Sequence, residues 1–333
     1  MKGLYVVKKI ICLLLIAVLL LSLTCCEVNY SEEANAEYAK NQELENKLNH
    51  NAFSGDSYVY FFRKQSIYRI DKKADQCSLI SATDMSFADI AVHGDTLYYV
   101  GKAEEYDISD VTELPYDGLY KLMKYDGEKT VELLTLYSSA NLNVTGDTLR
   151  IRNAESNFLN YYDITGDPDK LKDISAPDIP APEYDVGISS YSGKTEAIVL
   201  IDKDDNAEKI APLDGFYGDT DSYIVLDKEA YYVYSGGIYC VDFKSREIRE
   251  ILSLGKNADL FNLDNEYLYC RKGKSEYFRV KIDGSGSITE YPQLSQVDVT
   301  RMDVAGAYMF AYVSSDMSLI KVRKDGKGEA ETF

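Results

Sequence analysis

The stretches that decide the fold are GDTLYYV at residues 94–100 and LYKLMKYDG at residues 119–127. The first begins with the turn residues Gly94 and Asp95 and continues into a run of apolar and aromatic residues. The second is a short run rich in apolar residues and tyrosine that ends in another turn pair, Asp126 and Gly127. Turn residues placed before and after short runs of this kind are typical of antiparallel β-hairpins.

Both stretches return along the chain at a regular interval. The copies of the second stretch have their second positions at 68, 120, 160, 199, 239, 277 and 319, so the intervals are 52, 40, 39, 40, 38 and 42 residues. A period of about 40–45 residues that supplies four short strands is typical of a β-propeller. We therefore predict an all-β propeller of four-stranded blades with seven blades, and with six or eight as alternatives. A β-solenoid or two stacked sandwiches account less well for this spacing.

Residues 1–24 read as an export signal. Lys2, Lys8 and Lys9 precede an uncharged apolar stretch of 14 residues over 10–23, which is shorter than the roughly 20 residues that span a membrane. The following residues, Leu23-Thr24-Cys25-Cys26, resemble the lipobox of bacterial lipoproteins, although a cysteine at position 25 departs from the usual small residue. This resemblance implies lipidation at Cys26, with Cys25 as the alternative acceptor. Two acyl chains on one cysteine anchor a protein firmly to a membrane.

These features divide the chain into three parts. Residues 1–25 are predicted to be a lipoprotein signal peptide, and residues 26–50 to be a polar tether, partly helical or disordered. Residues 51–333 are predicted to form the propeller. The expected location is therefore the cell membrane, on its extracytoplasmic face, through a lipid anchor.

The composition narrows the functional classes. The chain has 55 acidic and 36 basic residues and a net charge of −19, which argues against a nucleic-acid partner. Only two histidines are present, so few histidine-based catalytic or metal sites are open to it. We therefore predict no metal and no cofactor. The propeller region carries three cysteines, Cys77, Cys240 and Cys270, and an odd number favours free thiols.

The repeated segments resemble the uncharacterised tyrosine-rich propeller repeats of Gram-positive bacterial lipoproteins, which are similar to the YWTD propellers of lipoprotein receptors. The matching runs are those at 94–99 and 119–127, and the resemblance covers about residues 51–333. The chain departs from such repeats in having no tryptophan. The resemblance implies a binding or scaffold role rather than a known reaction.

Loops on one face of the propeller are the expected binding surface, because function concentrates on loops held by a rigid scaffold. The long interval places extra residues in a loop over 101–118, and the segment 213–221 should reach the same face. The candidate binding residues there are Glu104, Tyr106, Asp107, Tyr116, Asp214, Tyr217 and Asp219. A set of solvated charged loops without a ligand is the alternative interpretation.

We therefore expect a module that binds a protein, peptide or glycan. A polysaccharide-acting enzyme (a glycosidase or lyase) and a sensor subunit of a membrane complex are the alternatives. The chain has none of the common short catalytic motifs, so catalysis is not assigned and no catalytic residue is named.

Overall fold

A computed structural model gives the structure of the chain, which forms two compact units, Met1–Lys40 and Asn41–Phe333. All residues that the structure describes belong to the second unit. They are residues 42, 44–63, 66–82, 86–102, 119–136, 138–153, 159–166, 170–175, 185–191, 194–202, 206–213, 223–255, 258–313 and 315–333.

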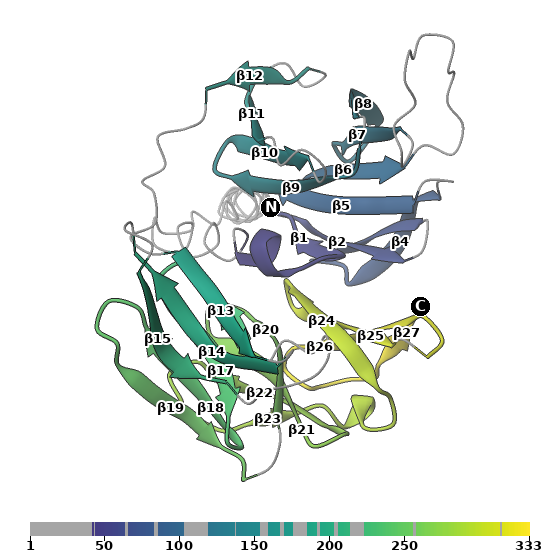
Figure 1. The fold of residues 1–333 in the computed structure, drawn as a ribbon. Coiled ribbons are helices and arrows are strands. Elements are labelled where there is room, and N and C mark those ends of the chain that lie inside the picture. The colour runs from purple at the N-terminus through teal and green to yellow at the C-terminus, as the bar shows by residue number, and fades with distance from the viewer. Residues whose placement is uncertain are drawn as a thin grey trace, which may run out of the picture. The chain divides into compact units, whose positions relative to one another are not determined.

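The described residues form seven antiparallel sheets, each built from strands that follow one another along the chain (Figure 1). The first sheet has β1 (Ala52–Ser54), β2 (Tyr58–Arg63), β3 (Ser66–Asp71) and β4 (Gln76–Ala82), the second has β5 (Ser86–His93), β6 (Thr96–Lys102), β7 (Tyr120–Tyr125) and β8 (Thr130–Leu136), and the third has β9 (Ala140–Thr145), β10 (Thr148–Asn153), β11 (Leu159–Asp163) and β12 (Lys172–Ile174). The fourth sheet has three described strands, β13 (Asp185–Tyr191), β14 (Lys194–Ile201) and β15 (Ala207–Pro212).

The remaining sheets again have four strands each. The fifth contains β16 (Tyr223–Val225), β17 (Glu229–Tyr234), β18 (Gly237–Asp242) and β19 (Ile248–Ser253), the sixth contains β20 (Ala258–Leu263), β21 (Tyr267–Lys272), β22 (Glu276–Lys281) and β23 (Thr289–Glu290), and the seventh contains β24 (Val299–Ala305), β25 (Tyr308–Val313), β26 (Ser318–Arg323) and β27 (Glu331–Thr332). A single 3-10 turn, η1 (Pro292–Leu294), leads from β23 to β24.

Strand β6 shows why the repeated stretch lacks polar alternation. Leu97 and Tyr99 belong to a buried cluster shared with the first sheet, whereas Tyr98 and Val100 belong to one shared with the third sheet. Alternate residues of a strand point to opposite faces, so a sheet packed on both sides needs apolar residues at every position. The unbroken apolar run LYYV therefore reflects the burial of both faces of this strand.

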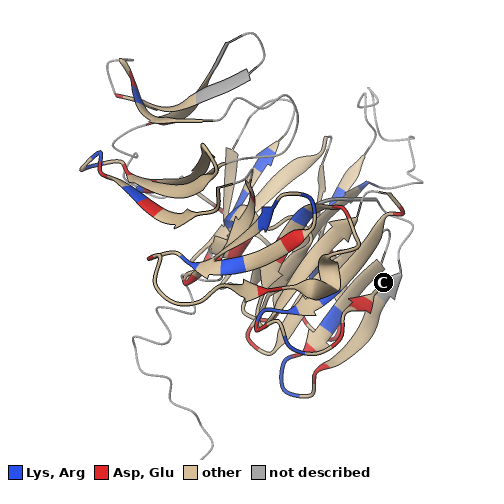
Figure 2. Cartoon of the chain, turned by 90° about the horizontal axis from the view of Figure 1, so that it is seen from below, with Lys and Arg blue, Asp and Glu red and all other residues tan. Residues whose placement is uncertain are grey.

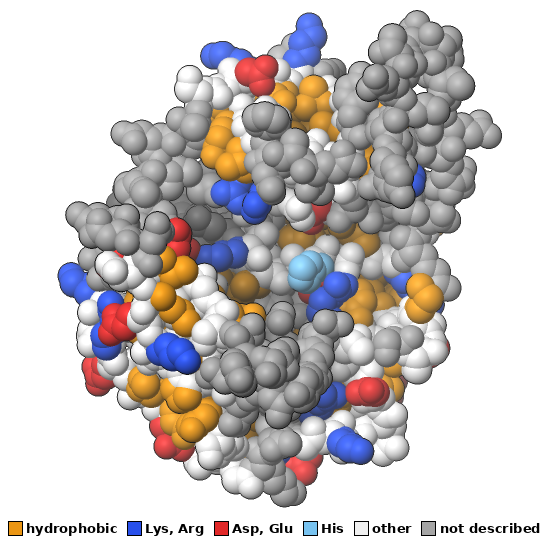
Figure 3. Space-filling model, viewed as in Figure 1, with side chains coloured by type: hydrophobic (Ala, Val, Ile, Leu, Met, Phe, Trp, Pro, Cys, Tyr) orange, Lys and Arg blue, Asp and Glu red, His pale blue; other side chains and the backbone are white. Residues whose placement is uncertain are grey.

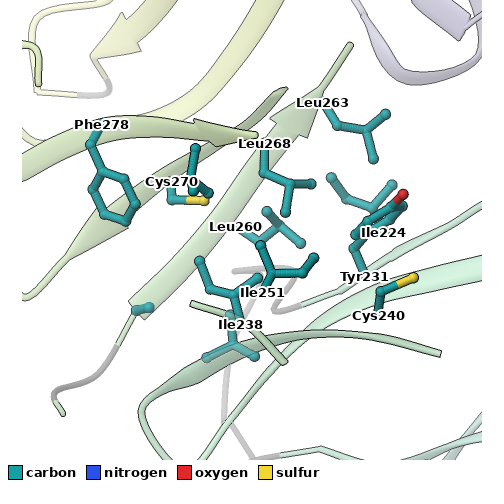
Figure 4. Close-up of a cluster of buried hydrophobic side chains, with 13 residues drawn as sticks. Ile224, Tyr231, Ile238, Cys240, Ile251, Leu260, Leu263, Leu268, Cys270 and Phe278 are labelled. Atoms are coloured by element: carbon teal, nitrogen blue, oxygen red, sulfur yellow. The ribbon is translucent and has the colours of Figure 1, made fainter. Parts of the chain in front are cut away.

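Buried clusters of this kind join neighbouring sheets along the chain, and a further cluster joins the seventh sheet to the first. Figure 4 shows the cluster between the fifth and sixth sheets, where Cys240 and Cys270 both lie among aliphatic side chains. Both thiols are free, as is the exposed Cys77, in agreement with the odd cysteine count. The predicted all-β fold is confirmed, and the seven sheets match a propeller of seven blades.

The fourth sheet is the exception to this packing within the described residues, where no comparable cluster joins it to the third sheet. Val199, Tyr68 and Tyr239 occupy the same position of the repeat. Tyr68 and Tyr239 lie on β3 and β18, the third strands of their sheets, and Val199 lies on β14. By its place in the period, β14 is therefore a third strand. The place of a first strand in this repeat falls on residues outside those described.

The turn pair Gly94-Asp95 explains why the motif begins with these two residues. Gly94 has φ of +55°, in the left-handed region that a tight hairpin turn needs and that glycine adopts at little cost. The Asp95 carboxylate accepts a hydrogen bond of 2.7 Å from the backbone N–H of Ser57 in the first sheet. The Tyr60 hydroxyl donates to the Asp95 carbonyl at 2.8 Å. One turn thus also fastens its sheet to the neighbouring sheet.

The two ends of the second unit meet where the seventh sheet contacts the first. Strand β1 contacts β24, and the Phe333 ring packs edge-on against Phe61 with ring centroids 5.0 Å apart. All four strands of the seventh sheet come from the C-terminal part of the chain. The first and seventh sheets are therefore joined by side-chain packing and by the contacts of the residues just before β1.

Those residues form a short helix over 44–48, inside the segment predicted as a tether. The compact unit thus begins at Asn41, ahead of the boundary at Asn51 that the repeat pattern indicates. In the described part of the chain no helix has the length and apolar character needed to cross a membrane. The predicted signal peptide and Cys26 lie outside the described residues.

Candidate functional site

The helix over 44–48 lies against the first strands of several sheets. Leu44 and Leu48 are four residues apart and so lie on one face of the helix. Both pack against the buried cluster between the fifth and sixth sheets. Lys47, one position earlier than Leu48, forms an ion pair of 2.6 Å with Asp227 in the turn after β16. The apolar face therefore holds the helix on the fifth and sixth sheets.

Two buried asparagines bind the other side of this segment to the sheets. The Asn46 side chain donates to the carbonyl of Val92 at 3.1 Å and accepts from the N–H of the same residue at 3.2 Å. The Asn49 amide donates to the carbonyls of Ala52 and Val304, each at 2.7 Å. An amide can pair with a backbone N–H and C=O in the way that a neighbouring strand would. These side chains thus take the place of a strand partner for β5 and β24.

The Asn49 oxygen completes a network that crosses three sheets. It accepts from the Asn262 side chain at 2.8 Å and from the N–H of Val304 at 3.1 Å. Asn262 also donates to the Met302 carbonyl at 2.9 Å, so β20 and β24 are joined through side chains. Every polar atom of Asn49 is paired in a buried position, which makes this residue the main link between the helix segment and the sheets.

The Glu45 carboxylate points from the helix toward the sheets. Its two oxygens accept from the N–H of Ser54 at 2.7 Å and from the N–H of Gly306 at 3.2 Å. Burial raises the pKa of this carboxyl from 4.5 to about 7, although Lys324 and the two backbone donors favour the charged form. Near neutral pH the group therefore titrates in the folded protein.

This shift predicts a stability that depends on pH. A raised pKa means that the folded state binds a proton more tightly, so the contribution is fully present below pH 4.5 and is lost as the pH rises to about 7. We expect the wild-type free energy of unfolding to fall by about 1–3 kcal/mol relative to Glu45→Gln across this window, a range reduced because the side chain keeps some exposure.

Urea unfolding at intervals between pH 4.5 and 8 measures this difference directly. Glu247→Gln, which replaces an exposed carboxyl on the outer edge of the fifth sheet, serves as the control and should leave the pH profile of the wild type unchanged. A difference in unfolding free energy between wild type and Glu45→Gln that stays constant over the whole pH range would contradict the raised pKa of Glu45.

A pocket of about 360 Å³ opens beside the helix segment. Its walls come from the first strands of the fifth, sixth and seventh sheets, from Lys47 and Leu48 at the end of the helix, and from His50 just after it. The lining residues are Lys47, Leu48, His50, Tyr223, Ile224, Val225, Asp259, Leu260, Phe261, Asn262, Thr300, Arg301 and Met302. The volume lies in the range of small-ligand sites, which is about 300–1,000 Å³.

Arg301 is the principal charged group of the pocket. Its guanidinium lies over the ring of Tyr312, 4.4 Å from the centroid, and its side chain is 38% exposed. Its Nε lies 3.9 Å from the Asp303 carboxylate, which has no exposed surface and accepts a hydrogen bond of 2.7 Å from the N–H of Asn51. Burial raises the pKa of Asp303, while Arg301 opposes that shift. The Asp303 carboxylate is therefore closer to the N–H of Asn51, just before β1, than to the Arg301 guanidinium.

Asp259 is the only carboxylate among the described residues of the lining, and a basic side chain outside the pocket already neutralises it. Arg271 contacts Asp259 at 2.8 Å and Asp298 at 3.0 Å, with only 13% of the arginine side chain exposed. The Arg271 guanidinium also lies 5.4 Å from the centroid of the Phe261 ring. The other charged side chains among the described lining residues, Lys47 and Arg301, are basic, and His50 also lines the pocket.

Charges of both signs are spread over the strands and turns of the described part (Figure 2), whereas the pocket is basic. In the space-filling view, Lys, Arg and His side chains gather around a hollow in the face that is visible (Figure 3). Within the described residues, no group of three His, Cys, Asp or Glu side chains is arranged to hold a metal ion. The pocket combines positive charge with apolar walls, an arrangement suited to binding.

All seven candidate binding residues from the sequence lie outside the described residues. These are Glu104, Tyr106, Asp107, Tyr116, Asp214, Tyr217 and Asp219. The structure therefore places none of these residues relative to the pocket. The ends of the two loops are described, with Lys102 closing β6 and Tyr223 opening β16, and Tyr223 lines the pocket.

Sequence reasoning did not find the pocket residues. Lys47 and His50 belong to the segment predicted as a tether, and Arg301 lies in a strand where a single basic residue is unremarkable. One available signal was the pair Leu44 and Leu48, whose helical spacing indicates an apolar face that needs a partner.

No family model matches the chain, and no curated protein matches its sequence. Solved structures similar to it include PorZ, a bacterial surface component of the type-IX secretion system of Porphyromonas gingivalis, with 13% identity and a TM-score of 0.45. A prolyl endopeptidase has 12% identity and a TM-score of 0.46, and virginiamycin B lyase from Staphylococcus aureus has 13% identity and a TM-score of 0.39. The alignments cover 85%, 90% and 80% of this chain, and 38%, 51% and 92% of those chains. The chain thus spans well under two thirds of the first two proteins.

Proposed function

We propose that the protein is a lipid-anchored β-propeller of the extracytoplasmic face that binds a protein, peptide or glycan partner. The observation that carries the binding role is the pocket formed by three first strands, the end of the helix and His50. It combines an exposed arginine with apolar walls, as ligand sites commonly do. The lipobox-like residues Leu23 to Cys26 support the anchor.

The proposed binding surface has two parts. The pocket is the first, and the acidic loops that carry Tyr106, Tyr116 and Tyr217 are the second. Tyrosine contributes a large contact area at low entropic cost, which suits a protein or peptide partner.

Crosslinking in intact cells, followed by capture of the full-length protein, tests this function. Thr300→Trp fills the pocket from an exposed position of β24, and the triple alanine variant of Tyr106, Tyr116 and Tyr217 removes the loop contacts. Thr135→Trp places the same bulk at an exposed position on the outer strand β8 and is the control. We expect the pocket variant or the loop variant to lose a crosslinked partner that the control retains.

The anchor is tested in the same cells. Cys26→Ser should move the protein from the membrane fraction to the soluble fraction, whereas Cys25→Ser should leave it on the membrane. A full set of partners retained by both binding variants would contradict the binding role. A membrane-bound Cys26→Ser protein would contradict the anchor alone.

A further inference from the structure

The pocket has a charge opposite to that of the whole chain. The chain carries a net charge of −19, yet among the described residues two charged basic side chains, Lys47 and Arg301, and one carboxylate line the pocket. That carboxylate, Asp259, is paired with Arg271 at 2.8 Å. Lys47 is paired with Asp227 at 2.6 Å, so Arg301 is the charge that a ligand in the pocket would meet. A positive site in an acidic protein attracts an anionic group over short distances, since salt screens the more distant negative charges.

Arg301 is available to such a group. Its stacking on Tyr312 uses the face of the guanidinium, while hydrogen bonds to a ligand would use the edge. In the part of the chain that the structure describes, its Nε is buried without a hydrogen-bond partner, so a ligand would meet the terminal nitrogens of the guanidinium. Asp303, the nearest carboxylate, is 3.9 Å away and already holds the N–H of Asn51. A planar carboxylate is the group that an arginine edge binds best.

The apolar walls distinguish a peptide from a sugar. A sugar typically stacks on a free aromatic ring, and the described lining residues include one tyrosine, Tyr223, and one phenylalanine, Phe261. Phe261 is next to the Arg271 guanidinium at 5.4 Å and the Tyr277 ring at 6.2 Å, and Tyr223 packs against the cluster between the fourth and fifth sheets. Leu48, Ile224 and Met302 supply aliphatic surface instead. Such surface suits an apolar side chain.

We propose that the pocket binds a peptide segment in which a carboxylate stands beside an apolar side chain. Arg301 binds the carboxylate, and the aliphatic wall of Leu48, Ile224 and Met302 holds the apolar side chain. This proposal rests on the proposed binding function and names the ligand class of the same pocket.

Fluorescence anisotropy with the full-length protein in detergent tests the ligand class. The probes are labelled acetyl-Glu-Phe-Glu-Phe-Glu-Phe-amide, the same peptide with Gln in place of Glu, and labelled trigalacturonate. We expect the acidic peptide to bind at least about tenfold more tightly than the Gln peptide, and trigalacturonate to bind weakly. Arg301→Gln should remove this preference, while Arg249→Gln, which loses the same charge on the outer strand β19, should keep it.

Thr300→Glu provides a second test that does not depend on how well the Arg301 variant folds. It adds a negative charge at an exposed position of the lining and should weaken the acidic probe about tenfold or more. Equal binding of the two peptides, absence of binding by both, or preferred binding of trigalacturonate would overturn the proposal. If Thr300→Trp still abolishes a crosslinked partner in cells, the binding function stands and only the ligand class fails.

Discussion

Replacing Asn49 with alanine is expected to lower the free energy of unfolding by about 3–5 kcal/mol, as breaking a buried polar network does. The Asn49 side chain pairs with two carbonyls, one backbone N–H and the Asn262 amide, and only 6% of the residue is exposed. Alanine removes all four bonds and leaves the partners buried without a replacement. Each unpaired buried polar group costs about 1–3 kcal/mol.

Urea or thermal unfolding of the full-length protein measures this loss. Asn160→Ala is the matched control, because Asn160 lies exposed on β11 and its replacement should change stability by less than about 0.5 kcal/mol. A loss below about 1 kcal/mol for Asn49→Ala would show that the network does not hold the first and seventh sheets together.

Removing residues 1–50 is expected to lower the midpoint of thermal unfolding by roughly 10 °C compared with removing residues 1–40, on the scale of 2–4 °C per kcal/mol. The longer truncation deletes Leu44 and Leu48 from the cluster of the fifth and sixth sheets. It also deletes Glu45, Asn46 and Asn49, whose side chains bond the first, second and seventh sheets. The shorter truncation leaves the compact unit Asn41–Phe333 complete.

Differential scanning calorimetry of the two truncated proteins tests this expectation, with the full-length chain as reference. The protein that begins at residue 41 should unfold within a few degrees of the full-length chain. Equal midpoints for the two truncated proteins would mean that the helix segment adds nothing to the propeller, and that the sheets alone close it.

The repeat period was readable because each sheet uses the same local rules. A turn such as Gly94-Asp95 requires a particular backbone, and a doubly buried strand such as β6 requires apolar residues at every position. These requirements act within a few residues, so the same residue types recur in most repeats. The segment 26–50 was predicted to be partly helical or disordered, but the packing of residues 44–48 against the sheets was not predicted, because a single pair of leucines in a polar segment is a weak signal.

The candidate site was less predictable than the fold. Loop length and acidic composition predicted binding residues in two loops that lie outside the described part of the chain. The pocket instead depends on Lys47, His50 and Arg301, of which the last is separated from the others by about 250 residues of sequence. No local rule connects them.

The sequence by itself therefore determined the all-β class, the repeat period, the turns and the doubly buried strands, because each follows from the conformational preferences of neighbouring residues. Tertiary structure alone decided how the seventh sheet meets the first, which residues just before β1 pair with them, and which basic side chains share a pocket. Those outcomes depend on contacts such as that of Asn49 with Val304, which join residues 255 positions apart. They exist only once all seven sheets have packed.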